Sequence, residues 1–179
     1  MPLEMHGKRI SAGGAASARP VKPATTRVVL ALDLADRTGW AASTRDGQIV
    51  SGTQNFRPPR MATGGFRFLA FLHWLSPLSK EFGGIDEVRF EEVRRHTGTT
   101  AAHVYGAYVG HLLVWCEQRG VEACGVPVGE IKKFATGRGN ADKVAMVDAA
   151  RRRGFTPIDH NEADALWLLL LTLHQLGDV

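Results

Sequence analysis

The sequence predicts an α/β fold with a mixed sheet, and three observations support this prediction. An apolar run rich in β-branched residues at 27–32 is typical of a buried strand. Two similar runs, at 38–43 and 48–53, flank an Asp-Gly turn at 46–47, which indicates a hairpin. Helical and strand-like segments then alternate to the end of the chain. We therefore expect an antiparallel three-stranded meander followed by parallel strands, giving five strands with helices on both faces.

The remaining elements follow from apolar periodicity and from Gly and Pro residues. Phe68, Leu69, Leu72 and Leu75 recur at helical spacing, and Pro77 marks a kink or an end of their helix. Asn140 is a candidate N-cap for a later helix with Asp142 in its first turn. In chain order we predict a helix at 64–82, a strand at 87–91, a helix at 99–119, a strand at 121–126, and helices at 128–135, 141–153 and 162–176.

Length and composition fit one globular domain. The chain has 179 residues, of which 44% are hydrophobic and 22% charged, so most of it is expected to fold. Residues 1–26 are rich in Gly, Ala, Ser, Pro and basic residues, which predicts a flexible basic arm ahead of a domain at 27–179. The sequence has no secretory signal, no apolar run long enough to span a membrane, and two cysteines without a CxxC pattern. A cytoplasmic location is the expectation.

Positive charge is concentrated in one segment. The net charge is +4, and residues 130–153 alone hold seven Lys/Arg against three acids. Clustered positive charge favours a polyanionic partner, because each neutralised phosphate releases condensed counterions. A solvated helix face is the alternative explanation. The charge distribution thus suggests nucleic acid as the partner.

Three acids occupy positions where burial alone would be costly. Asp33 follows the first apolar strand, Glu91 ends the fourth strand, and Asp164 lies within an apolar helix. An ionised carboxylate among apolar neighbours requires a cation, a donor or a metal. Neighbouring strand ends and a packed helix could bring the three together, where hard oxygen ligands suit Mg²⁺ or Mn²⁺. Two such ions could activate a water and stabilise the leaving 3′ oxygen in phosphodiester hydrolysis.

Each acid also has a purely structural explanation. Asp33 could accept backbone N–H groups in a turn, Glu91 could pair with Arg89 or Arg94, and Asp164 could cap or form a salt bridge. Strand alternation places Glu91 and its neighbour Glu92 on opposite faces, and it does not by itself decide between them.

Two lysines are candidates for the same site. Lys132 lies on the predicted helix at 128–135, and Lys143 begins the next one. Either ammonium could stabilise negative charge on a phosphoryl group in a transition state. The alternatives are plain contact with a DNA backbone or exposure to solvent.

Four blocks of sequence resemble RuvC-type Holliday-junction resolvases, and most closely the shorter RuvC-like proteins of phages and prophages. The blocks span most of the chain after residue 27, and the third is the most specific. They are Leu-Ala-Leu-Asp at 30–33 with Thr-Gly-Trp at 38–40, Phe-Glu-Glu-Val at 90–93, the run 131–143, and Glu-Ala-Asp-Ala-Leu at 162–166.

The resemblance implies an RNase H-like fold, a homodimer, Mg²⁺ that Mn²⁺ can replace, and paired nicks across a four-way DNA junction. It implies that Asp33, Glu91 and Asp164 are metal-binding catalytic acids, and that Lys132 and Lys143 are catalytic lysines that also contact DNA. The family's fourth metal ligand, an Asp or His, falls here on Asn161. His160 and Glu162, on either side of it, are the alternative ligands.

A second departure from the family follows Glu91. Bacterial members place an aromatic residue there that inserts into the junction, and this chain has Arg94, Arg95 and His96. These side chains could stack on bases or bind phosphates. Lys133 and Arg138 in the basic segment complete the candidate DNA-binding set.

The sequence therefore predicts a crossover junction endodeoxyribonuclease. Two alternatives stay open at this stage. One is a non-catalytic nucleic-acid-binding module, which Asn161 favours. The other is a related nuclease that acts on flaps, other branched DNA or RNA.

Overall fold

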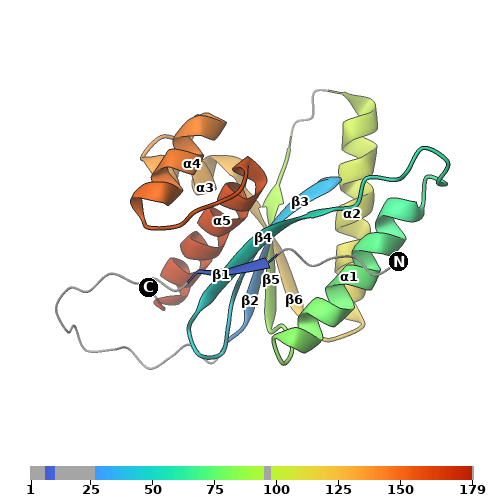
Figure 1. Ribbon diagram of the computed structural model, residues 1–179, viewed down its shortest axis with the longest axis horizontal. Helices are drawn as coiled ribbons and strands as arrows, with labels where there is room; N and C mark the ends of the chain where they lie inside the picture. Colours follow the sequence, from blue (N-terminus) through green and yellow to red (C-terminus); the bar gives the residue numbers. More distant parts are fainter. Residues whose placement is uncertain (1–6, 11–26, 95–97, 179) are drawn as a thin grey trace.

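A six-stranded mixed sheet forms the centre of the protein, as a computed structural model of residues 7–10, 27–94 and 98–178 describes it (Figure 1). The strands lie in the order β1-β4-β3-β2-β5-β6. They are β1 (Gly7–Ile10), β2 (Val29–Asp33), β3 (Arg37–Ser43), β4 (Ile49–Asn55), β5 (Glu87–Glu92) and β6 (Glu122–Pro127). The predicted meander and the parallel strands after it are confirmed.

Helices cover both faces of the sheet (Figure 1). One face carries α1 (Phe66–Glu81) and α2 (Thr99–Glu117). The other carries α3 (Val128–Thr136), α4 (Lys143–Arg152) and α5 (His160–Leu176). None of these helices is long and apolar enough to cross a membrane, within the part of the chain that the structure describes.

The meander is defined by its antiparallel strand pairing and by its turn. β2 and β4 both run antiparallel to β3, and Gly47 in the turn between β3 and β4 adopts φ 79°, a conformation that glycine tolerates best. β2 pairs with β5, and β5 with β6, in parallel. As a consequence β2, β4, β5 and β6 all end at the same edge of the sheet.

The two faces have different cores. Beneath α1 and α2 the core is aromatic, with Phe56 in edge contact with Phe71 and Trp74. Tyr108 of α2 is fully buried there. Beneath α3 to α5 the core is aliphatic and is built on the leucines of α5.

Four details differ from the sequence prediction. Residues 7–10 of the predicted arm form the edge strand β1 against β4, while residues 1–6 and 11–26 lie outside the described residues. α1 continues through Pro77. Asn140 is not the cap of α4: Asp142 is, because its carboxylate accepts the Ala145 N–H at 2.8 Å. α5 begins two residues early, since Asp159 caps it.

Candidate active site

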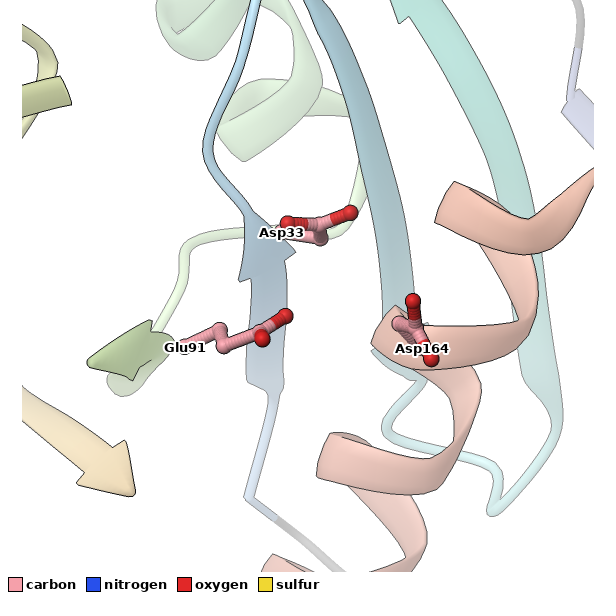
Figure 2. Close-up of side chains that lie close together, drawn as sticks. All are labelled: Asp33, Glu91 and Asp164. Atoms are coloured by element: carbon pink, nitrogen blue, oxygen red, sulfur yellow. The ribbon is translucent and has the colours of Figure 1, made fainter. Parts of the chain in front are cut away.

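Three carboxylates come together at the edge of the sheet where β2 and β5 end. Asp33 closes β2, Glu91 lies at the end of β5, and Asp164 projects from the second turn of α5 (Figure 2). One oxygen from each lies within 4.8 Å of the others. The convergence that the sequence predicted is therefore present in the fold.

Strand pairing accounts for two of the three positions. β2 and β5 are parallel neighbours with Leu32 opposite Phe90, so the next residues on each strand, Asp33 and Glu91, lie side by side. Phe90 is buried beneath α2, and alternation turns Glu91 to the opposite face, toward α5. This geometry selects Glu91 over Glu92, which pairs with Arg94.

A glycine in β3 accounts for the position of the third acid, Asp164. A Cβ on Gly39 would lie 1.9 Å from the backbone oxygen of Asn161 in the first turn of α5. Only glycine lets the helix approach β3 this closely, and Gly39 is paired with Asp33. Asp164, one turn further along α5, is thereby held against the end of β2.

No arginine neutralises the cluster among the described residues. Arg89 pairs with Glu87 and Arg94 with Glu92, so the two structural explanations for Glu91 fail. Asp164 does not cap α5 either, because Asp159 does. The carboxylate oxygens of the three acids lie close to one another instead.

The electrostatics of the site follow from this arrangement. Burial, and then the charges of Glu91 and Asp164, raise the pKa of the Asp33 carboxyl well above its ordinary value. Burial also raises the pKa of Glu91. For Asp164, burial and the charge of Glu91 raise the pKa to about 7. A divalent cation would relieve this repulsion, and three carboxylate oxygens are donors that Mg²⁺ and Mn²⁺ prefer.

Both candidate lysines act on the cluster electrostatically. The charge of Lys132 lowers the pKa of Glu91 and Asp164, and that of Lys143 lowers the pKa of all three acids. Lys143 lies at 2.9 Å, Nζ to Nε2, from His160. Burial and the nearby Lys143 charge lower the pKa of His160, so the neutral imidazole accepts a hydrogen bond from the ammonium.

The three candidates for a fourth metal ligand differ in the contacts that they make within the protein. Glu162 is buried and accepts from the Ser51 hydroxyl at 2.7 Å and the Ile158 N–H at 2.8 Å, so it is a structural acid away from the cluster. His160 contacts Lys143. Asn161 lies one turn before Asp164, with its backbone against Gly39.

The predicted DNA-binding residues that the structure describes lie on several elements. Lys133 and Arg138 are exposed on and just after α3, and the exposed Arg94 pairs with Glu92. Arg95 and His96 lie outside the described residues.

One residue of the site has no signal in the sequence. The Tyr105 hydroxyl of α2 donates to the Glu91 carbonyl at 2.7 Å and accepts the Val93 N–H at 3.2 Å. It thereby fixes the backbone where β5 ends. The helical pattern around Tyr105 predicts a helix, and no local pattern shows that its hydroxyl reaches a strand end.

Comparison with solved structures identifies the architecture. Thermus thermophilus RuvC superposes with a TM-score of 0.68 at 19% identity, over 85% of this chain and 98% of that one. The chain has the fold of RuvC. The T. thermophilus RuvC complex with a Holliday junction substrate gives a TM-score of 0.70 at 19% identity, over 85% and 97% of the two chains.

A eukaryotic structure is also similar. The yeast mitochondrial Holliday junction resolvase Ydc2 superposes with a TM-score of 0.55 at 13% identity, over 83% of this chain and 78% of that one. The sequence matches no protein-family model and no curated protein. The predicted RNase H-like fold is confirmed.

Proposed function

We propose that this protein is a divalent-metal-dependent endonuclease that resolves four-way DNA junctions, as a member of the RuvC-type resolvases. The observation that carries the proposal is the cluster of Asp33, Glu91 and Asp164, whose oxygens lie within 4.8 Å without an arginine partner among the described residues. The fold supports it, because one similar structure is a Holliday junction resolvase by name and another is RuvC in complex with a Holliday junction substrate. Closeness to phage and prophage members stays a prediction from the sequence.

The donor set fits Mg²⁺, and Mn²⁺ should substitute for it. Two ions per active site are part of the proposal. Asp33, Glu91 and Asp164 would hold the metal, and Asn161 is the candidate for an additional oxygen ligand. When bound, such ions supply Lewis-acid chemistry for phosphodiester hydrolysis, in which water attacks phosphorus and the 3′ oxygen leaves. The acids must be ionised to bind, so metal uptake displaces the protons that burial favours.

The lysines supply positive charge to the scissile phosphate. Lys132 and Lys143 influence the carboxylates from α3 and α4 without an ion pair to them within 4.0 Å among the described residues. Their charge is thus available to a phosphoryl group beside the cluster, where it stabilises the charge that develops during cleavage. By accepting a hydrogen bond from Lys143, His160 keeps this side chain oriented.

The fold and the positive charge support branched DNA as the substrate. Lys133, Arg138 and Arg94, together with Arg95 and His96, are proposed to bind the junction backbone beside the cluster. Two nicks placed symmetrically across a junction require two active sites, so we propose a homodimer whose symmetry matches that of the DNA. A cytoplasmic location is consistent with such a substrate.

The test is cleavage of a synthetic mobile four-way junction with Mg²⁺, with Mn²⁺ and with chelator alone. Wild-type protein should nick two opposing strands only with a divalent ion. Asp33→Asn should bind the junction as wild type does and fail to nick it. Glu92→Gln is the matched control, because its carboxylate is paired with Arg94, and it should cut normally.

The same assay separates the related activities. Flap, linear duplex and RNA–DNA hybrid substrates should be cut more slowly than the junction. Wild-type cutting by Asp33→Asn, or no divalent-dependent cutting of any branched substrate, would overturn the proposal, and the second result would favour a non-catalytic binding module.

A further inference from the structure

The loop between β4 and α1, residues 57–65, leaves the sheet at the same edge as the carboxylate cluster. The strand register aligns Asp33 with Gly39 and Gly39 with Thr53, so β4 ends two residues beyond the row of the cluster. In Figure 1 the loop projects on the side of α1 and α2. The basic helices α3 and α4 lie over the other face, together with α5, which carries Asp164 of the cluster.

The charge of this region is of one sign. From Phe56 to Lys80 the sequence has four basic residues and no acid. Arg67 is committed to Asp36, whose two carboxylate oxygens it contacts at 2.8 and 2.9 Å. Arg57 and Arg60 are exposed, and neither guanidinium forms an ion pair with another described residue. They are therefore available to an anion.

The base of the loop is anchored in the core. Phe56 is buried and its N–H donates to the Asp36 carbonyl at 2.6 Å. Asp36 also accepts from Arg67 and from the Tyr108 hydroxyl. These contacts tie both ends of the loop to the β2–β3 connection and to α2. The loop is presented from a fixed point.

The tip is a hydrogen-bonded turn. The Ala62 N–H donates to the Pro59 carbonyl at 2.9 Å, which places Arg60 and Met61 at its two central positions. Pro58 and Pro59 restrict the backbone that leads to it. Met61 is 94% exposed, an unusual position for an apolar side chain in a folded domain.

We propose that residues 57–65 form a second DNA-binding element, which holds a duplex arm of the junction on the side of the cluster away from α3 and α4. Arg57 and Arg60 bind backbone phosphates. Met61 packs against sugars and base edges in the DNA groove that lies between these phosphates. This inference rests on the proposed function, because it takes branched DNA as the substrate. It assigns the loop a role in affinity and none in bond cleavage.

Fluorescence anisotropy with a labelled four-way junction, without divalent ions and at several KCl concentrations, tests the arginines. The double variant Arg57→Gln/Arg60→Gln should bind about tenfold or more weakly at moderate salt, and the slope of log K against log[KCl] should fall by about 2. Lys80→Gln removes an exposed charge at the other end of α1 and should change neither quantity. Affinity and slope equal to those of Lys80→Gln would overturn the proposal.

Met61 is tested with Met61→Ser and Met61→Leu in the same assay. The serine variant should bind several-fold more weakly with an unchanged salt slope, and leucine should restore binding. Equal binding by both variants would overturn the role of Met61. Failure of this inference is distinguishable from failure of the proposed function. If wild type cuts junctions and the loop variants bind DNA as wild type does, only the role of the loop is refuted. If the loop variants show a reduced salt slope but wild type never cuts, only the nuclease activity is refuted.

Discussion

The two ends of strand β5 carry glutamates in opposite circumstances. Glu87 begins the strand, is 1% exposed, and is held by Arg27 at 2.9 Å and by Arg89. Glu91, near the other end, is also largely enclosed but lies against Asp33 and Asp164. The same residue type in one strand is thus paired with arginines at one end and grouped with two other acids at the other.

Helix α5 repeats the contrast over two residues. Glu162 is buried with a hydroxyl and a backbone N–H as donors, whereas Asp164 faces the other acids. A fold that can satisfy Glu87 and Glu162 fully is capable of satisfying buried carboxylates. The repulsion at Asp33, Glu91 and Asp164 is therefore a local feature, of the kind expected where a cation binds.

The largest expected effect separates the two ends of β5. Glu91→Gln should lower the rate of junction nicking by about 10³-fold or more, the upper range for loss of one electrostatic group, without destabilising the metal-free fold. Glu87→Gln should destabilise the fold by about 2 kcal/mol, because Arg27 and Arg89 lose a buried partner, and its folded fraction should still cut. Chemical denaturation measures the stability of the two variants, and single-turnover nicking measures their activity. A Glu91→Gln variant that is unstable but active, or a Glu87→Gln variant that is stable but inactive, would contradict the contrast between the two ends of β5.

The second effect concerns the stability of the metal-free protein. The pKa of Asp164 is about 7 in the fold against an ordinary 3.8, so the folded state holds the proton more tightly than the unfolded chain. Its contribution to stability is present below about pH 4 and is lost as the pH rises through 7. Asp164→Asn has no carboxyl to ionise, so it does not lose stability in this way as the pH rises. At pH 8 with chelator it should be more stable than wild type by on the order of 2–4 kcal/mol, since one pKa unit is about 1.4 kcal/mol.

Thermal unfolding from pH 4 to 8 checks this prediction. The stabilities of wild type and Asp164→Asn should converge near pH 4, where the wild-type carboxyl is protonated. An asparagine variant that is less stable than wild type at pH 8 would show that the ionised Asp164 carboxylate has stabilising partners in the fold, as Glu162 has.

A third effect is stabilisation by the ion. At pH 8 wild type should gain about 2.7 kcal/mol at a Mg²⁺ concentration of 100 times Kd, through mass action on the folded state. Glu91→Gln should gain much less, whereas Glu87→Gln should gain as much as wild type because its carboxylate is at the opposite edge. Equal stabilisation of all three proteins would place the ion elsewhere.

The smallest effect tests the attachment of Glu91 to α2. Tyr105→Phe removes the hydrogen bonds to the Glu91 carbonyl and the Val93 N–H while it keeps the ring. The nicking rate should fall several-fold, and the Mg²⁺ concentration for half-maximal rate should rise. A structural role alone would lower stability and leave the metal requirement unchanged.

Much of the fold could be predicted because its signals are local. Apolar runs and the Asp-Gly turn predicted the meander. The helix between β4 and β5 indicated that β5 runs parallel to β2. The acids at Asp33 and Asp164 stood out because their neighbours are apolar. Local caps were harder: Asn140 and Asp142 are both good N-cap residues, and the backbone geometry decides between them.

The rest depends on contacts between distant segments. The sequence does not show that Glu162 meets Ser51, more than a hundred residues away, and so leaves it as a candidate ligand. The close approach of α5 to Gly39 and the reach of Tyr105 to β5 are likewise tertiary. Strand β1 was missed because its residues lack an apolar run and gain their partner only from the edge of β4.

The most direct test of the metal centre is calorimetric titration of Mn²⁺ into the protein at pH 6.5, in two buffers of different ionisation enthalpy. Because the pKa of Asp164 is about 7, its carboxyl holds a proton at pH 6.5, so binding should release it, and the release should shrink as the pH rises above 8. Asp33→Asn and Glu91→Gln should bind far more weakly, and Glu92→Gln should match wild type. Binding without proton release, or binding that survives both substitutions, would contradict a metal site at Asp33, Glu91 and Asp164.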